Sequence, residues 1–184
     1  MTERTFLDTI LKNPYNRALL ARLNELELPQ TFLTAGCLFQ TVWNVRAGQP
    51  PTASINDCDV FYFDESDSSF EGEDIAIRRA AELFADVPVH LELRNQARVH
   101  LWFQNKFGED CPRLNSSEHA ISRFLVLGTC VGVNANSEVF SPFGLNDLAD
   151  GLLRPNPVNS TPELYRRKVA SYRQRWPWLK EMSS

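Results

Sequence analysis

The sequence lacks the features that would place the chain in a membrane or in an oxidising compartment. No run of about 18 apolar residues occurs, and the first residues do not show the basic-then-apolar pattern of a secretory signal. The four cysteines are scattered without a CxxC pair, which argues against a zinc ribbon and a disulfide framework. We therefore expect a cytoplasmic protein with reduced, mostly buried thiols and no membrane partner.

Repeats and low-complexity tracts are also absent, and the composition is that of an ordinary globular protein. The chain has 184 residues, of which 43% are hydrophobic and 23% charged. This length suits one domain with a sizeable core. We expect a single domain over 1–184, with its core at about 29–150 and a C-terminal helical extension at about 151–184.

The net charge of -4 hides an asymmetry along the chain. From residue 151 onward, seven Lys or Arg residues stand against two Glu residues, which gives +5 and leaves -9 for the first 150 residues. Three interpretations of the basic end stay open. It pairs with the acidic body of the same chain, it contacts a polyanion such as a triphosphate, or it forms a solvated helical face.

Hydrophobic spacing and turn residues predict an α+β protein, in which a small mixed sheet is flanked by helices. Asn13 and Pro14 are typical of a helix start, and Gly36 opens an amphipathic helix. The expected strands and helices then alternate as β-α-β-α-β. In chain order we expect a strand at 31–35, a helix after Gly36, a strand from Asp57, a helix at 71–84 and a strand at 89–94. Further on, 99–103 is either strand or helix, 128–133 and 138–141 form a hairpin, and a helix covers 162–175.

Two carboxylates lie two residues apart where the strand from Asp57 begins. Residues i and i+2 of a strand point to the same face, so Asp57 and Asp59 lie side by side, roughly 7 Å apart at their Cα atoms. Two such charges repel by on the order of 3 kcal/mol at an effective dielectric near 20, which a divalent cation relieves. Cys58 points to the opposite face and is expected to be a buried structural thiol.

A glycine and a third carboxylate accompany this pair in chain order. A helix start behind Gly36 offers free backbone N–H groups to a phosphate. Glu92 lies on the polar face of the next strand with His90 and Arg94. Two metal ions held by such carboxylates would stabilise the attacking and leaving oxygens of a phosphoryl or nucleotidyl displacement.

With these motifs the chain resembles the nucleotidyltransferase superfamily, which has the fold of DNA polymerase beta, and more closely a bacterial family of nucleotidyltransferase-like proteins. The resemblance runs from about Pro14 to Trp178. The stretches that carry it are 35–36, 56–64, 95–102, 117–121 and 141–148.

The resemblance implies a fold, a site and a reaction. Asp57, Asp59 and Glu92 would bind Mg²⁺ (or Mn²⁺) and act in catalysis, while Gly36 and Cys37 would lie under the phosphates. The reaction would transfer a nucleoside monophosphate from a nucleoside triphosphate to an acceptor hydroxyl, with release of pyrophosphate. The superfamily usually has Gly or Ser after the motif glycine. Cys37 is a poorer hydrogen-bond donor than serine.

Several alternatives remain open on the sequence alone. Arg98 binds phosphate or acceptor, or it belongs to a structural hydrogen-bond network. The chain is an enzyme, a catalytically inactive nucleotide-binding or regulatory protein, or a toxin-like transferase that acts on tRNA or protein. Nucleic acid is the less expected partner, because no aromatic stripe is interleaved with the basic residues at the C-terminal end.

Overall fold

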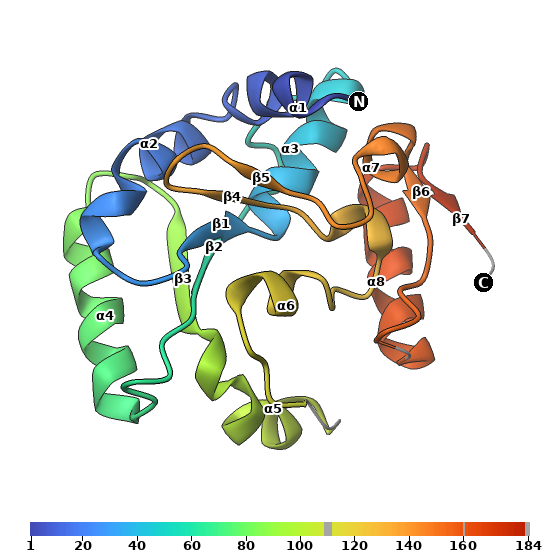
Figure 1. Cartoon of the computed structure of the whole chain (residues 1–184). Helices are drawn as coiled ribbons and strands as arrows, with labels where there is room; N and C mark the ends of the chain where they lie inside the picture. The colour runs from blue at the N-terminus through green and yellow to red at the C-terminus, as the bar shows by residue number, and fades with distance from the viewer. Residues whose placement is uncertain (109–111, 160, 183–184) are drawn as a thin grey trace.

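The computed structural model of the protein describes residues 1–108, 112–159 and 161–182. Its centre is a mixed sheet of five strands in the order β3-β2-β1-β4-β5 (Figure 1). The strands are β1 (Phe32–Thr34), β2 (Asp57–Tyr62), β3 (His90–Asn95), β4 (Gly132–Asn134) and β5 (Val139–Phe140). β2 and β3 run parallel, and every other neighbouring pair in this sheet is antiparallel. The predicted α+β fold class is therefore confirmed.

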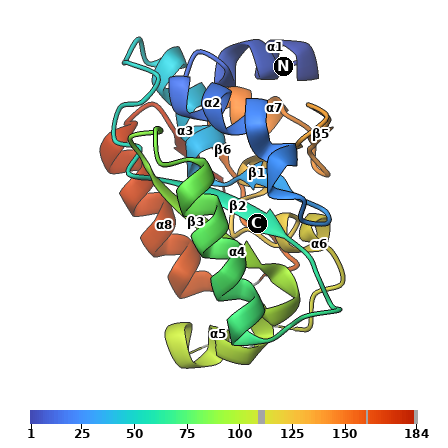
Figure 2. The same ribbon diagram turned by 90° about the vertical axis from the view of Figure 1, so that its left-hand side faces the viewer.

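Eight α-helices surround this sheet in the described part of the chain. They are α1 (Glu3–Ile10), α2 (Pro14–Arg22), α3 (Gly36–Arg46), α4 (Phe70–Leu83), α5 (Val99–Phe107), α6 (Ser117–Ile121), α7 (Asn146–Asp150) and α8 (Pro162–Arg175). Short 3-10 turns lie at Leu23–Leu26, Gln96–Arg98 and Leu127–Thr129. α4 packs against β3 and faces the viewer in Figure 2, whereas α8 lies on the opposite side of the molecule from α4 (Figure 1). No helix in the described ranges is long and apolar enough to cross a membrane.

Local capping signals set several helix starts where the sequence predicts them. The side chain of Asn13 accepts a hydrogen bond from the backbone N–H of Tyr15, and Pro14 is the first residue of α2. Ser116 caps α6 in the same way, through the backbone N–H of His119 at 2.9 Å. These predictions hold because each depends only on residues within one helical turn.

One hydrophobic core joins the sheet, α3 and the C-terminal helix. Trp43 of α3 is 1% exposed, and its ring centroid lies 5.2 Å from that of Trp176, which follows α8. The indole N–H of Trp176 donates to the side chain of Asn44 at 2.9 Å. Val169 and Tyr172 of α8 belong to the same buried cluster. The position of α8 relative to α3 is therefore fixed by tightly packed aromatic side chains.

Two features go beyond what the sequence pattern predicts. The segment at 99–103, which could have been strand or helix, lies within α5. The C-terminal extension contains a parallel pair of short strands, β6 (Leu152–Leu153) and β7 (Lys180–Glu181), in addition to α8. The backbone N–H of Lys180 donates to the carbonyl of Gly151 at 2.8 Å, which ties the segment after α8 to the segment before it.

Candidate active site

β2 separates its side chains onto two faces, as the alternating sequence predicts. Cys58, Val60 and Tyr62 are buried, whereas Asp57, Asp59 and Phe61 remain partly exposed on the other face. Cys58 and Val60 lie in the core with residues of α3 and α4, so these two helices cover the apolar face. The two aspartates thus share the face of β2 that the core does not cover.

Strand register places the third predicted carboxylate directly beside this pair. Asp59 is paired with Glu92 on β3, and on its other side with Thr34 on β1. Thr34 stands two residues before the start of α3 at Gly36. The sheet therefore places Asp57, Asp59 and Glu92 on neighbouring strands next to the turn that contains Gly36, although the three segments are far apart in the chain.

Asp59 is the carboxyl group whose protonation this arrangement changes most. Burial, together with the negative charges of Asp57 and Glu92, raises the pKa of Asp59 from 3.8 to about 7. The positive charges of Lys168 and Arg94 oppose this rise. Among the described residues, no hydrogen-bond donor or cation directly contacts the carboxylate of Asp57 or Asp59. The two aspartates thus hold negative charge that the protein compensates only from a distance.

Glu92 differs from the two aspartates because it has an ion-pair partner. A carboxylate oxygen of Glu92 lies 3.1 Å from Nη2 of Arg94, which is two residues further along the same strand face. Within the described residues, no set of three His, Cys, Asp or Glu side chains is gathered closely enough to hold a metal ion. Carboxylate oxygens are nevertheless the ligands that Mg²⁺ prefers, so Asp57 and Asp59 fit such an ion.

The turn before α3 has an unusual backbone. Ala35 adopts φ 58° and ψ -138°, a conformation that glycine accepts and other residues rarely adopt. Gly36 then begins α3, and a Cβ on Gly36 would lie 2.6 Å from Nε2 of Gln40. Gly36 therefore makes room for the amide of Gln40, and the predicted contact between Gly36 and a phosphate stays a prediction.

The thiol of Cys37 points into the core. Cys37 is completely buried, and its Sγ donates to the carbonyl of Thr34 at 3.3 Å. Burial raises the pKa of this thiol well above its usual value, and the neighbouring Cys58 raises it further. Any phosphate contact from residue 37 would therefore come from its backbone N–H. Cys58 and Cys130 are buried as expected, while Cys111 lies outside the described residues.

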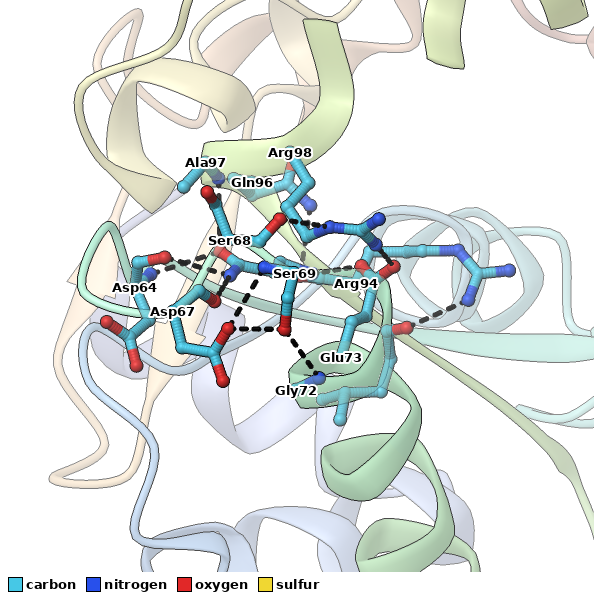
Figure 3. Close-up of polar contacts among 12 residues, drawn as sticks. Asp64, Asp67, Ser68, Ser69, Gly72, Glu73, Arg94, Gln96, Ala97 and Arg98 are labelled. Atoms are coloured by element: carbon cyan, nitrogen blue, oxygen red, sulfur yellow. Dashed lines mark hydrogen bonds and ion pairs between the residues drawn. The ribbon is translucent and has the colours of Figure 1, made fainter. Parts of the chain in front are cut away.

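Arg98 lies beyond the far end of β3, in a buried network. Its guanidinium forms an ion pair with Glu73 of α4, and its Nε donates to the carbonyl of Ser68 at 2.8 Å (Figure 3). The other carboxylate oxygen of Glu73 accepts the backbone N–H of Asn95 at 2.8 Å. These contacts match the structural alternative for Arg98. Arg98 follows Asn95, which pairs with Tyr62 at the opposite end of β2 from Asp57.

The sequence does not predict the contacts of two polar residues, Glu73 and Gln40. Glu73 lies inside the buried network, and its only signal is that an acidic residue falls on the apolar side of a predicted helix. Gln40 is four residues after Gly36, so the two share one face of α3. Neither residue belongs to a recognisable motif, which is why only the structure identifies them.

Comparisons with known proteins identify the family of the chain and a similar fold. The model of a nucleotidyltransferase family matches residues 21–180. A search of the curated proteins gives no match. Among solved structures, the chain is similar to a protein whose NMR structure is described as revealing the head domain of a CCA-adding enzyme. That similarity has 25% sequence identity and a TM-score of 0.78, and it covers 98% of this chain and 96% of the other. The chain belongs to the nucleotidyltransferase family whose model it matches.

Proposed function

We propose that the protein transfers a nucleoside monophosphate from a nucleoside triphosphate to an acceptor hydroxyl in a Mg²⁺-dependent reaction. The observation that carries this proposal is the shared face of Asp57 and Asp59, with Glu92 in register beside them. Family membership supports nucleotidyl transfer as the general reaction. The raised pKa of Asp59 supports cation binding, because a bound cation would stabilise the ionised carboxylate.

In this reaction the acceptor oxygen forms a bond to the α-phosphorus, and the bond between that phosphorus and the pyrophosphate oxygen breaks. Asp57 and Asp59 would hold Mg²⁺, or Mn²⁺, which supplies positive charge to the phosphate oxygens and to the attacking and leaving oxygens. Glu92 would complete the metal site or accept the proton that the acceptor hydroxyl loses. Arg94 contacts one oxygen of this carboxylate, so in either role the other oxygen would act or Arg94 would move away.

Ligand-induced stabilisation tests the nucleotide site without knowledge of the acceptor. We would measure the melting temperature with Mg²⁺ or Mn²⁺ and non-hydrolysable analogues of each of the four ribonucleoside triphosphates. A ligand present at 100 times its Kd stabilises the native state by about 3 kcal/mol, which raises the melting temperature of a domain of this size by roughly 5–10 °C.

The matched variants separate the site from general charge effects. Asp57→Asn combined with Asp59→Asn is expected to remove the shift, whereas Asp8→Asn, on the exposed side of α1, is expected to keep it. If no triphosphate raises the melting temperature of the native protein, the proposal is wrong.

A second candidate is nucleotide binding without transfer, and the ion pair between Glu92 and Arg94 favours it. This pair neutralises the carboxylate that would otherwise take the proton or bind a metal. Pyrophosphate release distinguishes the two candidates. The enzyme releases pyrophosphate when a cell extract containing RNA, proteins and metabolites supplies acceptors, whereas a protein that only binds nucleotide releases none with any fraction.

A further inference from the structure

The basic residues of α8 fall into two groups that the sequence does not distinguish. Arg166 forms an ion pair with Glu163 at 2.9 Å, and Arg173 forms one with Glu181 at 3.7 Å. Lys168 and Arg175 have no ion-pair partner among the described residues. Among the described residues, three cations on α8 therefore have no contacting carboxylate: Arg167, Lys168 and Arg175. Of these three, Lys168 and Arg175 lie against the ring of Tyr172.

These two cations and Tyr172 form one stripe along α8. Positions 168, 172 and 175 are separated by four and three residues, so they share one face of the helix. Nζ of Lys168 lies 5.9 Å from the ring centroid of Tyr172, and the guanidinium carbon of Arg175 lies 5.7 Å from it. Tyr172 in turn packs against Phe39 of α3 with ring centroids 5.5 Å apart. Tyr172 thus packs against α3, the helix that begins at Gly36.

Arg175 is held in a fixed position. Its Nη1 donates to Oε1 of Gln40 at 3.0 Å, and its guanidinium lies 4.5 Å from the ring centroid of Trp176. The amide nitrogen of Gln40 occupies the space that a side chain on Gly36 would fill. A half-buried guanidinium that is stacked and hydrogen-bonded loses little freedom when it binds an anion.

The stripe is close enough to the carboxylates to interact with them electrostatically. Gln40, which contacts Arg175, packs against Gly36, and Gly36 is two residues after Thr34, the strand partner of Asp59. Burial lowers the pKa of Arg175, and the charge of Asp57 acts against that effect. Among the described residues, neither cation forms an ion pair with Asp57 or Asp59, so the acidic and basic groups lie near the same turn without direct contact. A ligand that carries metal at one end and phosphate oxygens at the other would complement both sets of groups.

We propose that Gln40, Lys168 and Arg175 form an anion subsite that binds the polyphosphate part of the substrate and does not need the metal. This inference rests on the proposed function and adds the residues that would hold the phosphates. A planar guanidinium binds two oxygens of one phosphate, while a lysine ammonium binds as a point charge. The alternative is that the two cations only offset the charge of Asp57 and Asp59.

Binding of tripolyphosphate in the presence of EDTA tests the subsite alone. We would measure its Kd by titration calorimetry with the full chain, because this probe has neither a base nor a metal. The native protein is expected to bind it. Lys168→Met and Arg175→Met are each expected to weaken binding by roughly tenfold or more, because each removes a charge-assisted contact. Arg167→Met, an exposed cation on the same helix, is the matched control and is expected to change the Kd less than twofold.

The combined Asp57→Asn and Asp59→Asn variant separates this inference from the proposed function. It removes the metal ligands and the repulsion toward an anion, so it is expected to bind tripolyphosphate at least as tightly as the native protein. If the cations only offset these aspartates, Lys168→Met leaves the Kd unchanged. Absence of binding by the native protein, or an equal loss in Arg167→Met, also overturns the proposal. Because Lys168 is exposed, its variant tests the subsite even if Arg175→Met disturbs packing against Trp176.

Discussion

Replacing Asp59 with asparagine is expected to stabilise the metal-free protein at alkaline pH. The folded state raises the pKa of Asp59 from 3.8 to about 7, so it binds more protons than the unfolded state between these two values. The free energy of unfolding therefore falls as the pH rises through this window. Asp59→Asn does not show this fall, because asparagine does not ionise. The rise in pKa corresponds to a cost on the order of 4 kcal/mol once the carboxyl is fully ionised in both states.

Urea unfolding at pH 5 and pH 8 in the presence of EDTA measures this effect. The variant is expected to exceed the native protein in free energy of unfolding at both values, and the difference should be about 2–3 kcal/mol larger at pH 8 than at pH 5. With an m-value of about 2 kcal/mol per molar urea, the midpoint difference grows by roughly 1 M. Asp8→Asn serves as the exposed control, and its difference from the native protein should not depend on pH in this way.

A difference that is the same at both pH values, or a variant less stable than the native protein at pH 8, would refute this reasoning. The same variant is expected to lose the stabilisation by Mg²⁺ and nucleotide. Stability gained together with lost ligand response is the behaviour expected of a residue kept for function at a cost in stability.

Three further predictions concern residues around the site. Arg98→Met is expected to destabilise the protein by about 3–5 kcal/mol in urea unfolding, because it leaves the buried carboxylate of Glu73 unpaired. The exposed Arg79→Met should cost at most about 1 kcal/mol, and an equally small cost for Arg98→Met would contradict the buried network. Ala35→Gly is expected to raise the melting temperature, because it relieves about 1–3 kcal/mol of backbone strain. This gain exceeds the cost of about 0.4–1 kcal/mol that comes from the greater conformational entropy of the unfolded chain. A lowered melting temperature would argue against strain at this turn. Cys37 should remain unmodified by iodoacetamide in the native protein and react after unfolding, as peptide mass spectrometry can show; rapid labelling of native protein would mean that the thiol is accessible.

The sequence predicts those parts of the fold that depend on neighbours along the chain. Asn13 and Ser116 mark helix starts through contacts within one turn, and alternation places Asp57 and Asp59 on one strand face. Parallel pairing then makes Glu92 a neighbour of Asp59, which the order of strands and helices anticipates. These inferences succeed because they use the periodicity of a single element or the register of two adjacent strands.

The rest of the candidate site depends on contacts between distant segments. Arg175 and Gln40 are 135 residues apart, and no pattern within α3 or α8 indicates that they pair. The ion pair between Glu73 and Arg98 could not be predicted for the same reason. A basic residue after a predicted strand can contact a ligand or pair with a buried carboxylate, and the sequence does not distinguish the two. Cys37 occupies the position where the superfamily usually has Gly or Ser. Its thiol nevertheless points toward the carbonyl of Thr34, and only the packing of the folded chain reveals this.

The position of α8 has a consequence for how the protein folds. The carboxylates of the candidate site come from β2 and β3, whereas Lys168 and Arg175 come from a helix that begins at Pro162. Contacts over so many residues form late when local structure leads folding. A nascent chain that has formed only the sheet would carry the repelling carboxylates without Lys168 and Arg175 to offset them. Docking of α8 through Trp176 would then complete the hydrophobic core and the charge balance of the site in one step, so a folded core and a competent site would appear together.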